Sequence, residues 1–107
     1  MKSRIGFIAV VIATLSTTVS AAAQTAGETT YKAKCQMCHG ADGEAKTPAG
    51  KAMKAIPFSD PALVKKSDAD LIAATKNGKG KMPAYSDKLT DAQIKEVVAY
   101  IRTLQKK

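Results

Sequence analysis

The side chains best suited to hold a metal or a cofactor lie together in one short stretch. Cys35 and Cys38 are the only cysteines of the 107-residue chain, and His39 is its only histidine. On a helix, at about 100° per residue, the three side chains point into one arc of roughly 100°, so one flat ligand could meet all of them. The pattern Cys-x-x-Cys-His is the attachment pattern of c-type haem. We therefore expect one haem c, joined through thioethers to Cys35 and Cys38, with His39 as a ligand of its iron.

Three other uses of this cluster remain open from the residues alone. A zinc site needs four ligands, and the chain has no second Cys/His pair to complete one. A redox pair of the thioredoxin type expects a βαβ setting, and no buried strand pattern follows the motif. The third alternative is a structural disulfide with an incidental histidine. We favour haem because it uses all three residues.

The second axial ligand of the iron largely decides what a haem protein does. A second histidine is absent, so methionine is the candidate. Met37 lies inside the attachment motif, on the wrong side of its helix, which leaves Met53 and Met82. Met82 lies in a glycine-flanked loop, and Pro83 biases it toward an extended backbone. We favour Met82 as the second iron ligand, with Met53, close after the first helix, as the alternative.

The first 23 residues have the three regions of a secretory signal. Lys2 and Arg4 precede an apolar stretch over residues 5–15, and a small-residue cleavage site of the A-x-A type ends at Ala23. We expect a cleavable signal peptide over residues 1–23 and one small domain over residues 24–107, in the periplasm. An uncleaved membrane anchor is the alternative, but serine and threonine dilute the second half of the apolar stretch.

Helical signals dominate the remaining chain, and the fold class is all-α. We expect helices over residues 26–38, 61–66, 68–77 and 91–105, with residues 41–57 as a wrapping loop and residues 78–85 outside any helix. Helix starts are indicated by a capping box at Thr25 and Glu28, by Asp60-Pro61 and by Ser67. The last helix is the best specified. It has a capping box at Thr90 and an apolar stripe formed by Ile94, Val97, Val98, Ile101 and Leu104.

The net charge is +8, and two of these units belong to Lys2 and Arg4 of the leader. The lysines are scattered, without a basic run or interleaved aromatic residues, so we expect no nucleic-acid binding. The carboxylates are scattered too and suggest no catalytic pair. Lys79 and Lys81 are the basic residues that flank a chemically interesting position, Met82.

The chain resembles a class I cytochrome c of the short bacterial and photosynthetic kind. The resemblance rests on Cys35 to Gly40, on the stretch from Gly78 to Tyr85 with its Met-Pro, and on the closing helix around residues 97–101. It implies a small cytochrome c fold with three to five helices wrapped around one covalently attached haem.

The family resemblance also implies roles for particular residues. Gly27, Tyr31 and Tyr100 match the positions at which the first and last helices of this family cross. Pro48 fits the family's proline, whose backbone carbonyl fixes the ring of the proximal histidine.

With His39 and Met82 on the iron, no position remains open for a substrate or for oxygen. We therefore expect a soluble periplasmic one-electron carrier between larger redox complexes, and not an enzyme. The alternative is a cytochrome c subunit held permanently by a dehydrogenase or oxidase. A haem enzyme or gas sensor, a third possibility, needs an open iron.

The family resemblance implies that redox partners dock at the exposed haem edge. We expect Lys79 and Lys81 there, with Lys46, Lys51 and Lys54 as further candidates, and partners with acidic docking faces. We expect a monomer that has no stable membrane insertion after signal cleavage.

Overall fold

The computed structural model describes residue 6 and residues 21–106, and the described chain is all-α as expected. Its helices are α1 (Ala21–Lys34), α2 (Gln36–His39), α3 (Pro48–Ala52), α4 (Pro61–Val64), α5 (Asp68–Asn77) and α6 (Asp91–Gln105). Among the described residues, β pairing is limited to one isolated bridge between Lys79 and Met82. Most of the expected signal peptide, residues 1–23, lies outside the described residues. No helix in the described part of the chain has both the length and the apolar character needed to cross a membrane.

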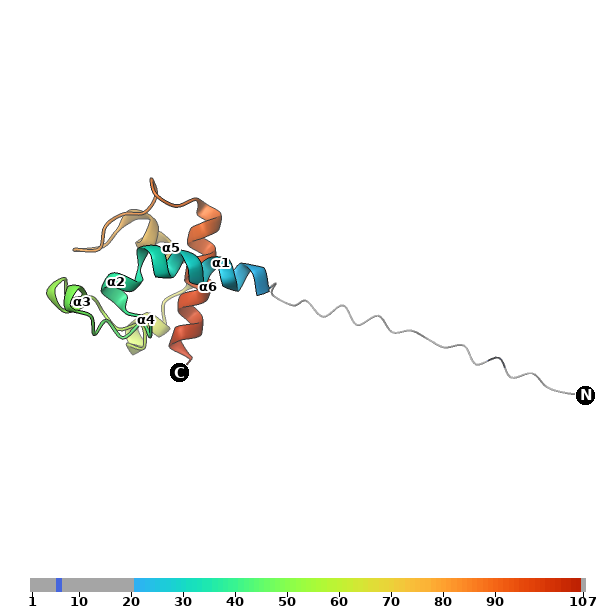
Figure 1. Ribbon diagram of the computed structural model, residues 1–107, viewed down its shortest axis with the longest axis horizontal. Helices are drawn as coiled ribbons and strands as arrows, with labels where there is room; N and C mark the ends of the chain where they lie inside the picture. The colour runs from blue at the N-terminus through green and yellow to red at the C-terminus, as the bar shows by residue number, and fades with distance from the viewer. Residues whose placement is uncertain (1–5, 7–20, 107) are drawn as a thin grey trace, which may run out of the picture.

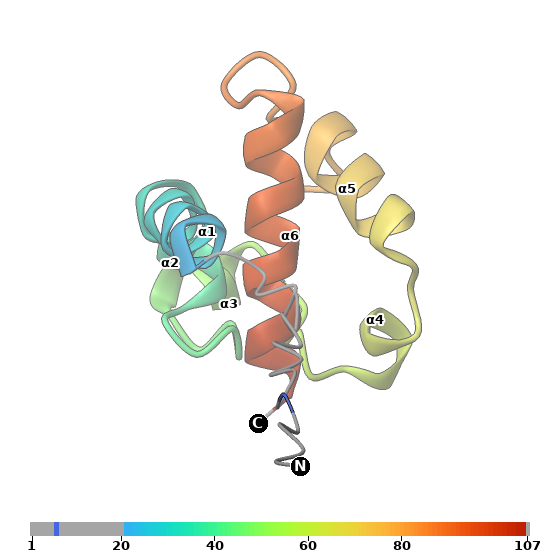
Figure 2. The same cartoon turned by 90° about the vertical axis from the view of Figure 1, so that its right-hand side faces the viewer.

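The last helix is the central element of the fold. Figure 2 shows α6 between α1, α2 and α3 on one side and α4 and α5 on the other. The predicted capping box is present, because the Thr90 hydroxyl accepts the Gln93 backbone N–H at 3.1 Å and the Gln93 side chain accepts the Thr90 N–H at 2.9 Å. Every member of the predicted apolar stripe is buried: Ile94, Val97, Val98, Ile101 and Leu104. The local signals therefore specified this helix completely.

The first and last helices, α1 and α6, cross each other (Figure 1). Their backbones come close together at Gly27, as the family resemblance implied. A Cβ atom on Gly27 would lie 2.9 Å from the carbonyl carbon of Glu96 and 3.2 Å from Cβ of Tyr100. Next to this crossing, the rings of Tyr31 and Tyr100 pack with centroids 5.2 Å apart. Only glycine lets the two backbones approach this closely.

The single helix predicted over residues 26–38 is wrong in its start and in its continuity, whereas the predicted stop at Gly40 is present. α1 begins at Ala21, so Thr25 and Glu28 lie inside the helix and not at its start. The helix is interrupted at Cys35, where φ is −115° and ψ is −33°, before α2 continues to His39. The buried Tyr31 hydroxyl donates to the carbonyl of Gly40 at 2.6 Å, which ties the end of α2 back to α1. A contact between residues this far apart in sequence cannot be seen in a local helix pattern.

The segment predicted as a wrapping loop contains one short helix. α3 has Thr47 as its N-cap, which accepts the Gly50 N–H at 3.0 Å, and Pro48 at its first position. α3 packs directly on α2, and Gly50 allows this close approach, since a Cβ atom there would collide with the Cys38 carbonyl. Five residues are too few to show an apolar period. Thr47-Pro48, an N-cap followed by proline at the first helical position, is a helix-start signal, and the prediction did not take it into account.

The connection between α4 and α5 follows its predicted caps. Asp60 caps α4, and the Ser67 hydroxyl accepts the Asp70 N–H at 3.1 Å at the start of α5. α5 has the predicted bounds, whereas α4 ends at Val64, two residues earlier than expected.

An arginine of α6 holds this connection in place. Nε of Arg102 donates to Asp68 at 2.8 Å. The other guanidinium nitrogens of Arg102 donate to the backbone carbonyls of Val64 and Lys66.

Candidate functional site

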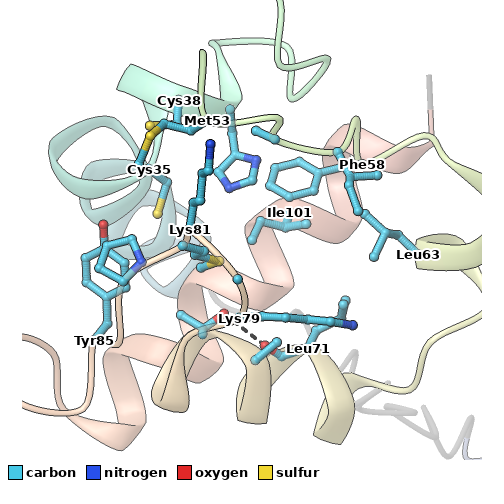
Figure 3. A pocket seen from close by; sticks show the side chains of 18 of the residues that line it. Cys35, Cys38, Met53, Phe58, Leu63, Leu71, Lys79, Lys81, Tyr85 and Ile101 are labelled. Carbon is cyan, nitrogen blue, oxygen red and sulfur yellow. Dashed lines mark hydrogen bonds between the residues drawn. The ribbon is translucent and has the colours of Figure 1, made fainter. Parts of the chain in front are cut away.

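A cavity of about 480 Å³ brings the predicted site residues together. Cys35, Cys38, His39 and Met82 all line it, and so does Met53. Figure 3 shows the side chains of Cys35, Cys38 and Met53 in the wall. Most of the remaining wall is apolar, with contributions from Phe58, Leu63, Leu71, Val97 and Ile101. In size and character this cavity matches sites for organic ligands, which are mostly apolar with a few placed polar groups.

The break between α1 and α2 gives the two cysteines different surroundings. Cys35 is buried beside the α1–α6 core, and burial raises the pKa of its thiol to about 11. Cys38 is half-buried, and both cysteines are free thiols. The disulfide alternative therefore finds no support in this structure.

The imidazole of His39 lies against an aromatic ring. Its centroid is 4.5 Å from that of Phe58, and the two planes are 19° apart, a stacked arrangement. Burial lowers the pKa of His39, which favours the neutral imidazole that binds metals. The Nδ1 atom is buried, and no residue that the structure describes offers it a hydrogen bond.

The expectation that the Pro48 carbonyl fixes this ring is therefore wrong for this structure. Pro48 is the first residue of α3. In a helix, the carbonyl of the first residue accepts the backbone N–H four residues on. Because α3 was not predicted, the expectation did not allow for a Pro48 carbonyl that points along the axis of a helix.

Met82 lies in a loop with a defined local structure. The backbones of Lys79 and Met82 exchange two hydrogen bonds, at 3.2 and 3.0 Å, around a two-residue turn. Gly80 has φ = +58° at the first central position, where such a turn favours glycine. A Cβ atom on Gly78 would lie 2.7 Å from the Met82 carbonyl oxygen, so the loop also needs glycine there.

Tyr85 anchors the loop that carries Met82 to two helices. Its backbone N–H donates to the Thr75 carbonyl of α5 at 3.1 Å. Its hydroxyl donates to the Lys34 carbonyl, at the end of α1, at 3.0 Å. The loop that carries Met82 is therefore held between α5 and α1.

Met53, the alternative ligand, occupies a different position in the site. It is the C-cap of α3, and α3 packs against α2. Figure 3 shows its side chain near Cys38. Met53 is 44% exposed, which is high for a group that would bind a buried iron. Both methionines line the cavity, but Met53 belongs to the segment packed on the attachment motif.

The charged residues that line the cavity all have the same sign. They are Lys34, Lys54, Lys79 and Lys81, and no acidic residue lines this cavity. Lys46 and Lys51, expected as further candidates, are exposed but do not line it. Lys34 was missed, although its position next to Cys35 was a signal.

The described residues do not offer the ligands that the zinc alternative requires. In residue 6 and residues 21–106, no three His, Cys, Asp or Glu side chains are grouped so that they could hold a metal ion. A βαβ setting for a thioredoxin-type pair is also absent from that part of the chain. An apolar cavity, two thiols and a half-buried imidazole fit a covalently held, flat macrocycle, and the Nδ1 of that imidazole has no hydrogen-bond partner among the described residues.

Comparisons with known proteins agree with this fit. The family described as cytochrome c oxidase, cbb3-type, subunit III matches residues 22–101. The cbb3-type cytochrome c oxidase subunit CcoP of Azospirillum brasilense is 33% identical over 106 residues, which cover 96% of this chain and 36% of that protein. The chain thus spans about a third of that relative's length.

Two further similarities are to small proteins. Cytochrome c6 of a Synechococcus species is 32% identical over 106 residues, covering 94% of this chain and 91% of that protein. The solved structure of the KustC0563 c-type cytochrome superposes with a TM-score of 0.68 at 31% identity, covering 74% of this chain and 96% of the other.

Proposed function

Because the chain belongs to the c-type cytochromes, with a single-haem domain of class I, we propose that it is a soluble periplasmic carrier of single electrons. We propose Cys35 and Cys38 as its attachment residues and His39 and Met82 as its iron ligands. One observation carries the proposal. A single apolar cavity is lined by both thiols and the imidazole from one side of the fold, and by Met82 from a separately anchored loop.

The residues of the cavity account for a carrier better than for an enzyme. When bound, the haem iron supplies one-electron oxidation and reduction. His39 contributes a neutral nitrogen ligand and Met82 a soft, neutral thioether, and the apolar wall disfavours extra charge. The thioether and the apolar wall favour the reduced state and a higher reduction potential. If His39 and Met82 both bind the iron, no position would remain on it for a substrate.

We propose that redox partners dock at the mouth of this cavity. Lys34, Lys54, Lys79 and Lys81 are exposed there, and no acidic residue lines the cavity. Such a one-sided charge attracts an acidic protein face and speeds encounter at low salt. The carrier would then act as a monomer that binds its donor and acceptor in turn.

We further propose that residues 1–23 are a leader that is removed during export. The charged start, the apolar stretch and the small residues up to Ala23 support this. The N-terminus of the protein purified from periplasm tests it, since cleavage predicts a chain that begins at Gln24. An intact N-terminus in membranes would favour the anchor instead.

A permanent subunit of an oxidase is the second candidate function. The similarity to CcoP, a subunit of a cbb3-type oxidase, favours it. The match to the Synechococcus cytochrome c6 favours the free carrier, because it covers 91% of that protein, which therefore contains little beyond this domain. An abundant free monomer after periplasmic extraction would support the carrier, whereas co-purification with a catalytic chain would support the subunit.

The absorption spectrum of the ferric protein tests the iron ligand. Met82→Ala is expected to abolish the weak near-infrared band from sulfur to iron and to let carbon monoxide bind the reduced protein. Met53→Ala, the matched control, removes a methionine from the same cavity and is expected to leave both properties unchanged. Loss of the band in Met53→Ala alone would show that the ligand assignment is wrong.

A further inference from the structure

The two proposed iron ligands come from separate parts of the fold. His39 ends α2, which follows closely on α1, whereas Met82 lies in the loop after α5, residues 78–85, here called the Met82 loop. α1 and α5 pack against opposite sides of α6 (Figure 2). The position of one ligand relative to the other therefore depends on α6 and on any contact that reaches directly from the Met82 loop to α1.

A hydrogen bond from Tyr85 makes such a direct contact. The Tyr85 hydroxyl donates to the backbone carbonyl of Lys34 at 3.0 Å, across 51 positions of the sequence. Lys34 is the last residue of α1 and immediately precedes Cys35. In Figure 3 the hydroxyl of Tyr85 points toward the side of the cavity that carries the two cysteines. The bond therefore joins the loop of one proposed ligand to the segment that carries the other.

The break in the helix at Cys35 leaves the Lys34 carbonyl available to Tyr85. In a continuous helix this carbonyl would accept the backbone N–H of Cys38, four residues on. The Cys38 N–H donates instead to the Cys35 carbonyl, at 3.3 Å. Carbonyls at the end of a helix need a partner from outside the helix, and Tyr85 supplies one here. The bond is thus a consequence of the way α1 ends.

Tyr85 is itself held firmly enough to restrain the Met82 loop. Its backbone N–H donates to the Thr75 carbonyl, and its own carbonyl accepts two N–H groups of the turn before α6, at 3.0 and 2.9 Å. Two residues, Pro83 and Ala84, separate it from Met82, and the proline ring fixes one of the backbone angles between them. A movement of Met82 away from the cavity therefore pulls on Tyr85.

We infer that Tyr85 is a positioning residue, whose hydroxyl holds the Met82 loop over the cavity and slows the release of Met82 from the iron. This inference rests on the proposed function, in which Met82 binds the haem iron. Release requires the loop to move away from α1, and this movement breaks the bond to Lys34, so the bond adds to the free energy of opening. A Cβ atom on Gly80 would meet nothing within 4 Å, so the tip of the loop has little packing of its own to keep it in place.

Displacement of Met82 by added imidazole, in the ferric haem-loaded protein, tests this inference. Imidazole binds the iron only after Met82 has left, so at saturating imidazole the rate at which the near-infrared sulfur band disappears measures the opening of the loop. Tyr85→Phe removes the hydroxyl and keeps the ring. It is expected to raise this rate roughly two- to fivefold, the factor that corresponds to one hydrogen bond. Without imidazole the variant should keep the band, because Met82 is still present.

Tyr31→Phe is the matched control for general destabilisation. It also removes one hydroxyl that donates to a backbone carbonyl, that of Gly40, but Tyr31 does not line the cavity. We expect it to lower the stability of the fold and to leave the displacement rate unchanged. A wild-type rate in Tyr85→Phe, or an equal rise in Tyr31→Phe, would overturn the inference. Failure of the proposed function has a different signature, because the near-infrared sulfur band would then be missing from the wild type before any imidazole is added.

Discussion

At Gly27, the close crossing of α1 and α6 predicts the opposite of what helix propensity alone predicts. In an exposed helix interior, glycine to alanine stabilises a protein by about 1 kcal/mol. At Gly27 the added methyl would lie 2.9 Å from the Glu96 carbonyl carbon and 3.2 Å from Tyr100 Cβ, where unstrained carbon contacts begin near 3.5 Å. One of the helices must therefore move by roughly half an ångström or more.

The loss of stability in Gly27→Ala depends on which atoms the added methyl group contacts. Overpacking costs about 1–3 kcal/mol, and the upper end applies because the neighbour is a backbone carbonyl, which cannot rotate away. Subtracting the propensity gain leaves a net loss of about 2 kcal/mol for Gly27→Ala. For a domain of this size, such a loss lowers the melting temperature by about 8–16 °C.

Thermal unfolding of the haem-loaded variants, followed by circular dichroism, measures this loss. Thr29 lies on the exposed face of the same helix. The pair Thr29→Gly and Thr29→Ala measures the propensity difference alone, with alanine more stable by about 1 kcal/mol. If Gly27→Ala raised the melting temperature as the Thr29 pair predicts, the close helix crossing would be refuted.

Three further predictions concern the contacts of Arg102 with the α4–α5 connection, a buried tyrosine and the docking surface. Arg102→Leu is expected to cost about 2 kcal/mol in urea unfolding, because two backbone carbonyls lose a charged donor. Asp68→Ala should cost less than about 1 kcal/mol, since that carboxylate is 71% exposed, and equal losses would contradict the role given to the carbonyls. Burial raises the pKa of Tyr31 above its ordinary value of 10.0, so the folded state favours neutral tyrosine and stability should fall as pH rises past 10.0. Tyr31→Phe should lose about 1 kcal/mol at neutral pH through its missing hydrogen bond. It should also show a weaker alkaline decline than wild type in urea titrations, and an equal decline would count against the pKa shift. In stopped-flow mixing with an acidic redox partner, Lys79→Glu should slow association several-fold at low salt, and the exposed Lys95→Glu on α6 should not. Rates that do not depend on salt would rule out the proposed docking surface.

Local signals predicted α5 and α6 to the residue because caps act over three or four positions. Ser67 and Thr90 each accept an N–H three residues on, and Gly78 ends α5 with φ = +76°. The same reasoning failed for α1. A capping box at Thr25 and Glu28 is consistent with a helix start, but it does not forbid a helix that begins earlier, at Ala21.

The break at Cys35 and the short α3 depend on contacts that no local pattern contains. Tyr31 bonds Gly40 across the break, and Gly50 packs against the Cys38 carbonyl. These contacts decide how the attachment motif is presented to the cavity, and they exist only once α2 and α3 have met.

The sequence by itself determined the chemistry of this protein, because a thioether-bound haem needs the residue types and spacing of Cys35, Cys38 and His39. The tertiary structure decided the surroundings of that chemistry. It brought Met82 and Met53 to one cavity, excluded Lys46 and Lys51 from its wall, and set Phe58 against His39. Covalent and ligand chemistry depends on a few neighbouring residues, whereas the wall of a cavity depends on which distant side chains pack together.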